Sequence, residues 1–126
     1  MCDVEITVEI LRQIEHAISV VLERFRIIHT VDDFLNTPEG LEKLDAICMK
    51  LIAIGESVKN IDKHTHRELL SQYPEIDWKG VMGVRDIISH HYFDLDAEEI
   101  FEICKTYLPP LHQTIKTMIF DLKNRG

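Results

Sequence analysis

Apolar residues recur at intervals of three and four along most of this chain, which is the pattern of amphipathic α-helices. The first such run comprises Ile6, Ile10, Ile14, Ile18, Val21, Phe25 and Ile28. The second comprises Leu41, Leu44, Cys48, Leu51, Ile54 and Val58. The last comprises Ile100, Ile103, Tyr107, Leu111, Ile115, Met118 and Leu122. No stretch alternates with a period of two, so the sequence predicts an all-α fold without strands.

The second helix has a clear start signal. Residues 31–37 interrupt the first apolar pattern, and Thr37, Pro38 and Glu39 then supply an N-cap, a first-turn proline and an acid at the positive end of the helix dipole. Gly55 lies inside the same helix, where it costs about 1 kcal/mol relative to alanine. We therefore expect tight packing of another helix at Gly55.

The middle of the chain predicts two further helices. A short one is expected over residues 67–72, because Pro74 prevents its continuation. Asp77 is placed to cap a longer helix that begins near Trp78 and runs through Ile88. Asp96, followed by Glu98 and Glu99, then caps the last helical region.

Two adjacent prolines divide that last region. Pro109 and Pro110 remove two backbone donors, which predicts a kink, or a break with a restart near Leu111. With 126 residues, the chain has room for one core, so we expect a single domain over residues 1–126. The expected architecture is an up-and-down bundle of about five helices.

Charge and hydropathy exclude several classes. The 14 basic and 22 acidic residues give a net charge of -8, so any contact with RNA must be local rather than general. The longest apolar runs, including 18–22 and 51–54, are far shorter than the roughly 20 residues that cross a bilayer. The first five residues include the acids Asp3 and Glu5 and no basic residue, unlike a signal peptide. A cytoplasmic protein without membrane contact is expected.

The cysteines point the same way. Cys2, Cys48 and Cys104 are odd in number and have no metal-binding or redox spacing. This usage fits a reducing compartment. Cys48 and Cys104 lie among apolar residues, so we expect them to be buried as small hydrophobic side chains.

The most informative stretch runs from Arg85 to Tyr92 and contains Asp86 and His90. At about 100° per residue, positions 85 and 90 lie roughly 140° apart on an ideal helix, whereas positions 85 and 92 nearly align. Either the helix loosens before His90, or Arg85 and His90 converge with help from a neighbouring helix or a second subunit.

This stretch resembles the HepT-like ribonuclease family of HEPN domains, whose signature R-x-x-x-x-H-x-Y is matched by Arg85, His90 and Tyr92. Three further segments resemble typical elements of that family, in the same order, namely 54–57 (IGES), 74–78 (PEIDW) and 108–111 (LPPL). The chain departs from the family pattern at Asp86, where asparagine is frequent, and at Ser57, where alanine is. The resemblance spans most of the chain and implies a HEPN-like bundle that dimerises.

The resemblance implies a toxin of a toxin-antitoxin system that cleaves RNA without a metal or other cofactor. The residue types suit that chemistry, because a histidine can take a proton from a ribose 2′-hydroxyl near neutral pH. An arginine can hold the scissile phosphate and stabilise the transition state. His90 and Arg85 are the expected catalytic residues, and the expected products carry a 2′,3′-cyclic phosphate and a 5′-hydroxyl.

The resemblance also implies partners. Two copies are expected to face each other and form one cleft from both Arg85–His90 pairs. A cognate minimal nucleotidyltransferase would act as the antitoxin by adenylylating Tyr92, which places a bulky anion in the cleft. Alternatively, Tyr92 is an amphipathic residue that packs at a helix end. A non-catalytic module that binds a nucleotidyltransferase, nucleotide or RNA is the competing interpretation, favoured by Asp86 and the net charge.

Other candidate residues have two interpretations each. Lys59, Lys63 and Arg67 recur every four residues and either form a basic stripe for RNA phosphates, if one helix carries them, or are a solvated helix face. Glu56 either approaches the cleft or forms a structural hydrogen bond. No metal site is predicted, because the two-residue spacing of His64 and His66 does not converge on a helix.

Overall fold

The computed structural model of the protein describes residues 3–90 and 96–125. All regular structure in these residues is helical, which confirms the predicted all-α class. In chain order the elements are α1 (Val4–Phe25), α2 (Asp32–Leu35), α3 (Pro38–His64), the 3₁₀ turn η1 (Leu70–Gln72), α4 (Trp78–His90), α5 (Ala97–Glu102), the π-helical segment η3 (Ile103–Tyr107) and α6 (Leu108–Lys123).

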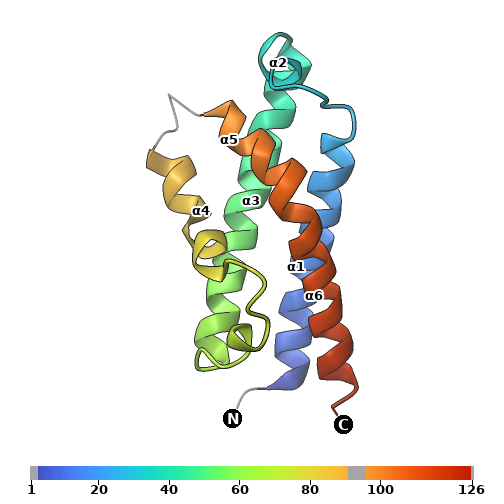
Figure 1. The fold of residues 1–126 in the computed structure, drawn as a ribbon, viewed down its shortest axis with the longest axis vertical. Helices are drawn as coiled ribbons and strands as arrows, with labels where there is room; N and C mark the ends of the chain where they lie inside the picture. The colour runs from blue at the N-terminus through green and yellow to red at the C-terminus, as the bar shows by residue number, and fades with distance from the viewer. Residues whose placement is uncertain (1–2, 91–95, 126) are drawn as a thin grey trace.

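The long elements form an up-and-down bundle, as Figure 1 shows. Helix α1 rises from the N-terminus, α3 returns beside it, and α4 rises again along the other side of α3. The last three elements, α5, η3 and α6, follow one another as an interrupted rod that descends to the C-terminus, with α6 against α1. The predicted topology is confirmed, and both termini lie at the same end of the bundle.

The buried apolar residues of these elements join in one hydrophobic cluster, and the three predicted stripes supply half of its buried members. The stripes fail at three positions, because Ile6, Leu41 and Tyr107 are 47%, 44% and 63% exposed. In the first helix Thr7 and Val8 are buried instead of Ile6. A run of i to i+4 steps drifts about 40° per step, so Ile6 lies roughly 80° from Ile14 around the helix axis. The helix therefore turns Ile6 out of the core.

The region between α1 and α3 contains an element that the sequence pattern did not reveal. Helix α2 places Phe34 in the core, where it is fully buried and packs against Phe25 with 6.2 Å between ring centroids. The predicted start of α3 is confirmed, because the Thr37 hydroxyl accepts a hydrogen bond from the amide of Gly40 at 2.9 Å.

The short helix predicted over residues 67–72 is wrong in its first half. Helix α3 ends at His64, and His66 and Arg67 then adopt left-handed backbone angles, with φ of 54° and 64°. Two such residues in succession cannot continue a right-handed helix. Only the η1 turn remains of the predicted helix.

The interruption of the last helical region lies earlier than predicted. Residues Ile103–Tyr107 form the π-helical segment, and α6 restarts at Leu108 rather than near Leu111. Pro109 and Pro110 therefore lie in the first turn of α6, where their missing amide protons break no helical hydrogen bond. A break is confirmed, and the prolines start the next helix instead of kinking it.

Cys48 and Cys104 are buried, as predicted. Burial raises the pKa of the Cys48 thiol to about 11 and that of Cys104 to about 12. Cys2 lies outside the described residues. Among the residues described, no helix combines the length and apolar character that a membrane span requires.

Candidate functional site

Helix α4 carries the described part of the sequence motif, from Arg85 to position 90, and hydrogen bonds fix the N-terminal end of this helix. The predicted cap is confirmed, because Asp77 Oδ1 accepts a hydrogen bond from the amide of Gly80 at 3.1 Å. Trp78 Nε1 donates to the carbonyl of Tyr73 at 2.9 Å, and the Tyr73 hydroxyl donates to Asp121 Oδ2 on α6 at 2.6 Å. Burial and the Asp121 carboxylate together raise the pKa of Tyr73 to about 12. The start of α4 is thus tied to the C-terminal helix.

A glycine sets the distance between α3 and α4. A Cβ atom at Gly55 would lie 2.9 Å from the backbone oxygen of Val81 and 2.9 Å from Val84 Cγ1. Both distances are shorter than an ordinary van der Waals contact. The close approach of α4 at Gly55 confirms the packing role predicted for this residue.

This close approach brings Glu56 opposite Arg85. Arg85 Nη1 donates to Glu56 Oε1 at 3.4 Å, and the two side chains are 55% and 43% exposed. A pair this long and this exposed contributes at most about 1 kcal/mol to stability. Glu56 therefore holds the Arg85 guanidinium loosely. Of the two roles predicted for Glu56, a structural hydrogen bond and an approach to the cleft, the structure shows the hydrogen bond.

The backbone geometry of α4 decides between the two ways of bringing Arg85 and His90 together. Helix α4 continues as a regular α-helix to His90, so the alternative in which the helix loosens before His90 is wrong. Positions 85 and 90 remain about 140° apart around the axis. The side chain of His90 and the whole of Tyr92 lie outside the described part of the chain.

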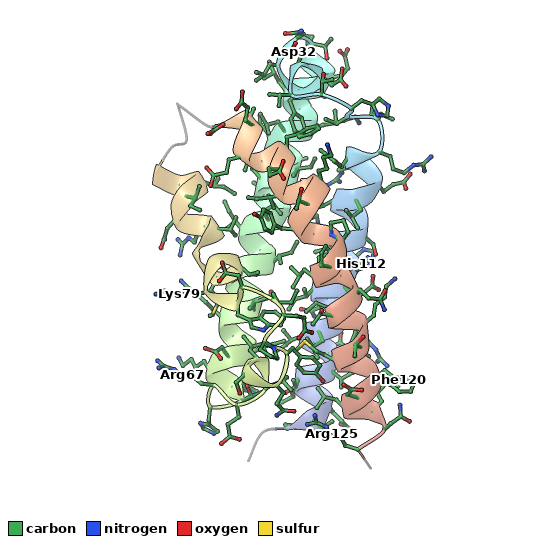
Figure 2. All side chains as sticks on the ribbon, in the orientation of Figure 1. Asp32, Arg67, Lys79, His112, Phe120 and Arg125 are labelled. Carbon is green, nitrogen blue, oxygen red and sulfur yellow. The ribbon has the colours of Figure 1, made fainter. Side chains whose placement is uncertain are left out.

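The predicted basic stripe is only partly assembled. Lys59 and Lys63 are exposed on α3, three and seven residues after Glu56, and so share its face of the helix. Arg67 lies beyond the end of α3 and projects from the connection to α4 (Figure 2). One helix does not carry all three, so the predicted stripe is wrong for Arg67. Asp86 is exposed beside Arg85 on α4.

Comparison with known proteins assigns the chain to a family. The family model described as "Ribonuclease HepT-like" matches residues 14–118, which is most of the chain. The chain belongs to the HepT-like ribonuclease family. The match includes Gly55, Glu56, Arg85 and His90, so the family region contains both helices of the candidate site.

Curated relatives of this HepT-like chain carry ribonuclease names. It is 32% identical over 94 residues, covering 75% of this chain and 72% of the relative, to "Putative RNase MJ0127" of Methanocaldococcus jannaschii. It is 30% identical over 88 residues, covering 70% and 72% respectively, to "Putative RNase TTE0752" of Caldanaerobacter subterraneus subsp. tengcongensis. A third relative, "Probable ribonuclease HepT" of Thermococcus cleftensis, is 33% identical over 66 residues, covering 52% and 56%. No solved structure matches the chain significantly. The family and these names support a ribonuclease function.

A second polar cluster of the HepT-like chain joins α1 to α6, and the sequence analysis missed it. His112 Nε2 lies 2.7 Å from Glu15 Oε2 and 3.2 Å from Ser19 Oγ, which itself donates to Glu15 Oε2 at 2.6 Å (Figure 2 labels His112). In a Ser-His-acid triad the hydroxyl and the carboxylate contact opposite ring nitrogens, whereas here both contact the same one. This cluster links the two helices, and because Ser19 and His112 lie 93 positions apart, the sequence contains no local signal for it.

Proposed function

We propose that this HepT-like chain is a metal-independent endoribonuclease that works as a homodimer with one composite cleft. The observation that carries the proposal is the unbroken α-helix from Trp78 to His90. It keeps positions 85 and 90 about 140° apart, while Glu56 holds Arg85 toward α3. The Arg85 guanidinium and the His90 imidazole of one α4 are therefore poorly arranged to act on the same phosphate. A second copy facing the first supplies the group that the first copy cannot bring to that phosphate.

The proposed reaction is an internal transfer within RNA. His90 takes the proton of a ribose 2′-hydroxyl, and the 2′ oxygen forms a bond to the adjacent phosphorus. The bond from phosphorus to the 5′ oxygen breaks, and the leaving oxygen takes up a proton. Arg85 neutralises the charge that develops on the phosphoryl oxygens, since its guanidinium keeps exposed N–H donors beyond the one that Glu56 accepts. The products carry a 2′,3′-cyclic phosphate and a 5′-hydroxyl.

RNA binding would be local. The face of α3 that presents Glu56 also carries Lys59 and Lys63, which we propose contact phosphates beside the scissile one. With a net charge of -8, the rest of the surface repels RNA on balance. Substrate binding is therefore expected to be weak and strongly dependent on salt.

The biological role proposed for this activity is that of a cytoplasmic toxin in a toxin-antitoxin pair. The proposed antitoxin is a minimal nucleotidyltransferase that transfers AMP to the Tyr92 hydroxyl. The added phosphate would repel RNA from the cleft beside Arg85. The reading frames that flank the gene offer a simple check, because the proposal expects a small nucleotidyltransferase there.

A non-catalytic module that binds a nucleotidyltransferase, nucleotide or RNA is the second candidate. Two observations favour it, namely the carboxylate of Asp86 next to Arg85 and the acidic net charge. This candidate expects Arg85 and His90 to affect binding without any RNA cleavage.

The test is cleavage of total RNA in the presence of EDTA by the wild type, Arg85→Ala and His90→Ala. Arg12→Ala and His16→Ala, at exposed positions of α1, are matched controls. All proteins are first shown to be folded by circular dichroism and dimeric by sedimentation. We expect only the wild type and the two control variants to cleave RNA, and we expect their products to carry 2′,3′-cyclic phosphate ends. If no protein cuts, or all cut equally, Arg85 and His90 lose their catalytic roles.

Mixing the two inactive variants tests the composite cleft. In the proposed dimer the cleft contains two active centres, each with Arg85 from one copy and His90 from the other. A mixed dimer of the two variants then has one intact centre and one centre that lacks both residues. Random exchange makes about half of the dimers mixed, so activity should return to about a quarter of the wild-type value. A mixture that stays inactive after subunit exchange contradicts the composite arrangement and leaves the roles of the two residues standing.

A further inference from the structure

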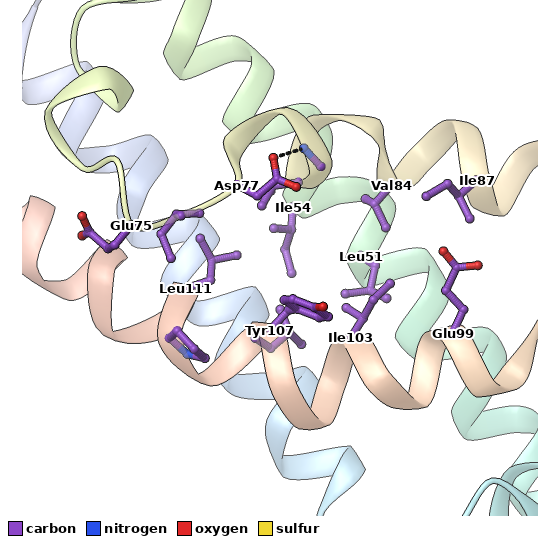
Figure 3. A pocket seen from close by; sticks show the side chains of 15 residues that line it. Leu51, Ile54, Glu75, Asp77, Val84, Ile87, Glu99, Ile103, Tyr107 and Leu111 are labelled. Atoms are coloured by element: carbon purple, nitrogen blue, oxygen red, sulfur yellow. Dashed lines mark hydrogen bonds between the residues drawn. The ribbon is translucent and has the colours of Figure 1, made fainter.

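A concave feature lies between α4 and the α5–η3–α6 rod, with α3 as its floor (Figure 3). Its volume is about 420 Å³, within the usual range of binding pockets. Its apolar lining includes Leu51, Ile54, Val84, Ile87, Ile103 and Tyr107. We call this feature the α4–α6 groove.

The α4–α6 groove is separate from Arg85 and from its contact with Glu56. Ile87 lies two residues after Arg85 on α4, about 200° further around the helix axis. Ile87 lines the groove, whereas Arg85 contacts Glu56 on α3 and is not part of the lining. A molecule in the groove would therefore contact α4 from the side opposite to the catalytic arginine.

The wall formed by the rod has an unusual backbone. Ile103 and Tyr107 both belong to the π-helical segment η3 and both line the groove. π-helical turns are rare and occur frequently at functional sites. Tyr107 is 63% exposed and Ile87 is 37% exposed, so large apolar surface is left open on both walls. Such surface usually marks a place where another molecule binds.

Two segments that the sequence analysis singled out, and that the proposed reaction does not use, also end at this groove. Glu75, Ile76 and Asp77 come from the segment before α4. Leu108 and Leu111 come from the start of α6. These segments therefore shape the groove rather than the surface around Arg85.

The charges around the groove identify the kind of molecule that would fit. Glu75, Asp77 and Glu99 lie at its edge, and none of the described residues that line it is basic. Asp77 is engaged in capping α4, whereas Glu75 and Glu99 form no ion pair within the described residues. An apolar floor with acidic edges disfavours phosphates, nucleotides and RNA, and favours a ligand that is apolar with flanking cations.

We propose that the α4–α6 groove binds an amphipathic helix of a partner protein, with its apolar face on Ile87 and Tyr107 and its lysines or arginines on Glu75 and Glu99. Helices bind in this way to apolar grooves between two helices. The acidic edges disfavour the same groove of a second copy as occupant, because like charges would then face each other. The proposal does not depend on the RNA cleavage proposed above, because it is argued from the lining and the charges of the groove and not from the roles of Arg85 and His90.

The test uses the full-length protein and a fluorescein-labelled synthetic peptide with leucines at helical spacing and lysines elsewhere. A second peptide replaces the lysines with glutamates, and a third has the lysine peptide's composition in scrambled order. Fluorescence anisotropy measures binding to the wild type, Tyr107→Asp and Glu99→Lys. Phe120→Asp is the control for Tyr107→Asp, because Phe120 is a 67% exposed aromatic residue on α6 outside the groove. Glu98→Lys is the control for Glu99→Lys, because both acids lie in the first turn of α5 and only Glu99 lines the groove.

The lysine peptide is expected to bind the wild type better than either comparison peptide. Tyr107→Asp should weaken binding about tenfold and Glu99→Lys about threefold, whereas both control variants should bind as the wild type does. Equal binding of the lysine and glutamate peptides, equal binding by all variants, or no binding would overturn the proposal. If the wild type binds no peptide and Tyr107→Asp no longer forms dimers, the proposal is also overturned, and the groove is assigned to a second copy of this chain.

Discussion

Two glycines inside helices predict opposite effects of the same substitution. Gly55 in α3 lies against α4, whereas a Cβ atom at Gly83 in α4 would have nothing within 4 Å. Alanine raises helix propensity by up to about 1 kcal/mol at either position. The two variants therefore differ mainly in what the added methyl group meets.

At Gly55 the methyl group meets backbone. Its distance of 2.9 Å to the Val81 oxygen must grow to the 3.4 Å of ordinary contact, so α3 and α4 must separate by about 0.5 Å, the difference of the two values. Overpacking costs about 1–3 kcal/mol, and the upper half of that range, about 2–3 kcal/mol, applies here because a backbone oxygen cannot move aside as the end of a flexible side chain can. After the propensity gain, Gly55→Ala should lose about 1–2 kcal/mol of unfolding free energy. The separation would also lengthen the 3.4 Å contact between Arg85 and Glu56.

Gly83→Ala should instead gain up to about 1 kcal/mol, so the two variants should differ by about 2–3 kcal/mol. In a domain of this size that is roughly 10 °C in melting temperature. The assay is thermal and urea unfolding followed by circular dichroism, with all proteins at one chain concentration because the proposed dimerisation would shift apparent stability. Gly55→Ala at or above wild-type stability would refute the packing argument, and a destabilised Gly83→Ala would refute the propensity argument.

Three further predictions concern buried or bridging side chains. The pKa of Glu15 is lowered by its hydrogen bonds to neighbouring side chains. The contribution of Glu15 to stability is therefore complete above the ordinary pKa of 4.5 and is lost as the pH falls through the lowered pKa. In Glu15→Gln, the free energy of unfolding measured in urea should depend less on pH over that range. Burial raises the pKa of Cys48 and Cys104 to about 11 and about 12, so at most one of the three thiols should react with a disulfide reagent at pH 7 before unfolding, and all three after it. Tyr73→Phe removes the 2.6 Å hydrogen bond to Asp121 and should cost about 1 kcal/mol in urea unfolding, whereas an unchanged midpoint would mean that this bond is energetically neutral.

The local features of the fold were predictable because each depends on neighbours in sequence. The caps at Thr37, Asp77 and Asp96 are present as predicted, since a short polar side chain needs only the next turn of backbone as its partner. One kind of error arose from the drift of the apolar stripe within a regular helix, as at Ile6, and another arose where the backbone departs from the regular helix. Nothing in the residue pattern distinguished the left-handed angles of His66 and Arg67 from a continuing helical turn.

The candidate site was predictable in its composition but not in its arrangement. Arg85 and His90 stand out because few residue types can perform acid-base chemistry or hold a phosphate. The pairing of Glu56 with Arg85 joins residues 29 positions apart, and it depends on the distance that Gly55 permits between α3 and α4. The α4–α6 groove likewise exists only because α4 and the π-helical segment η3 stand apart over α3.

The sequence by itself determined the helical class, the main helix starts and the chemical character of the motif, because periodicity, capping and residue type are local properties. Only the tertiary structure decided which side chains meet. Helix separation and rotation are set by packing among residues far apart in the chain, and a shift of one residue turns a side chain by about 100°. For this reason Ile6 lies in solvent, Thr7 lies in the core, and Arg85 lies against Glu56 rather than beside position 90.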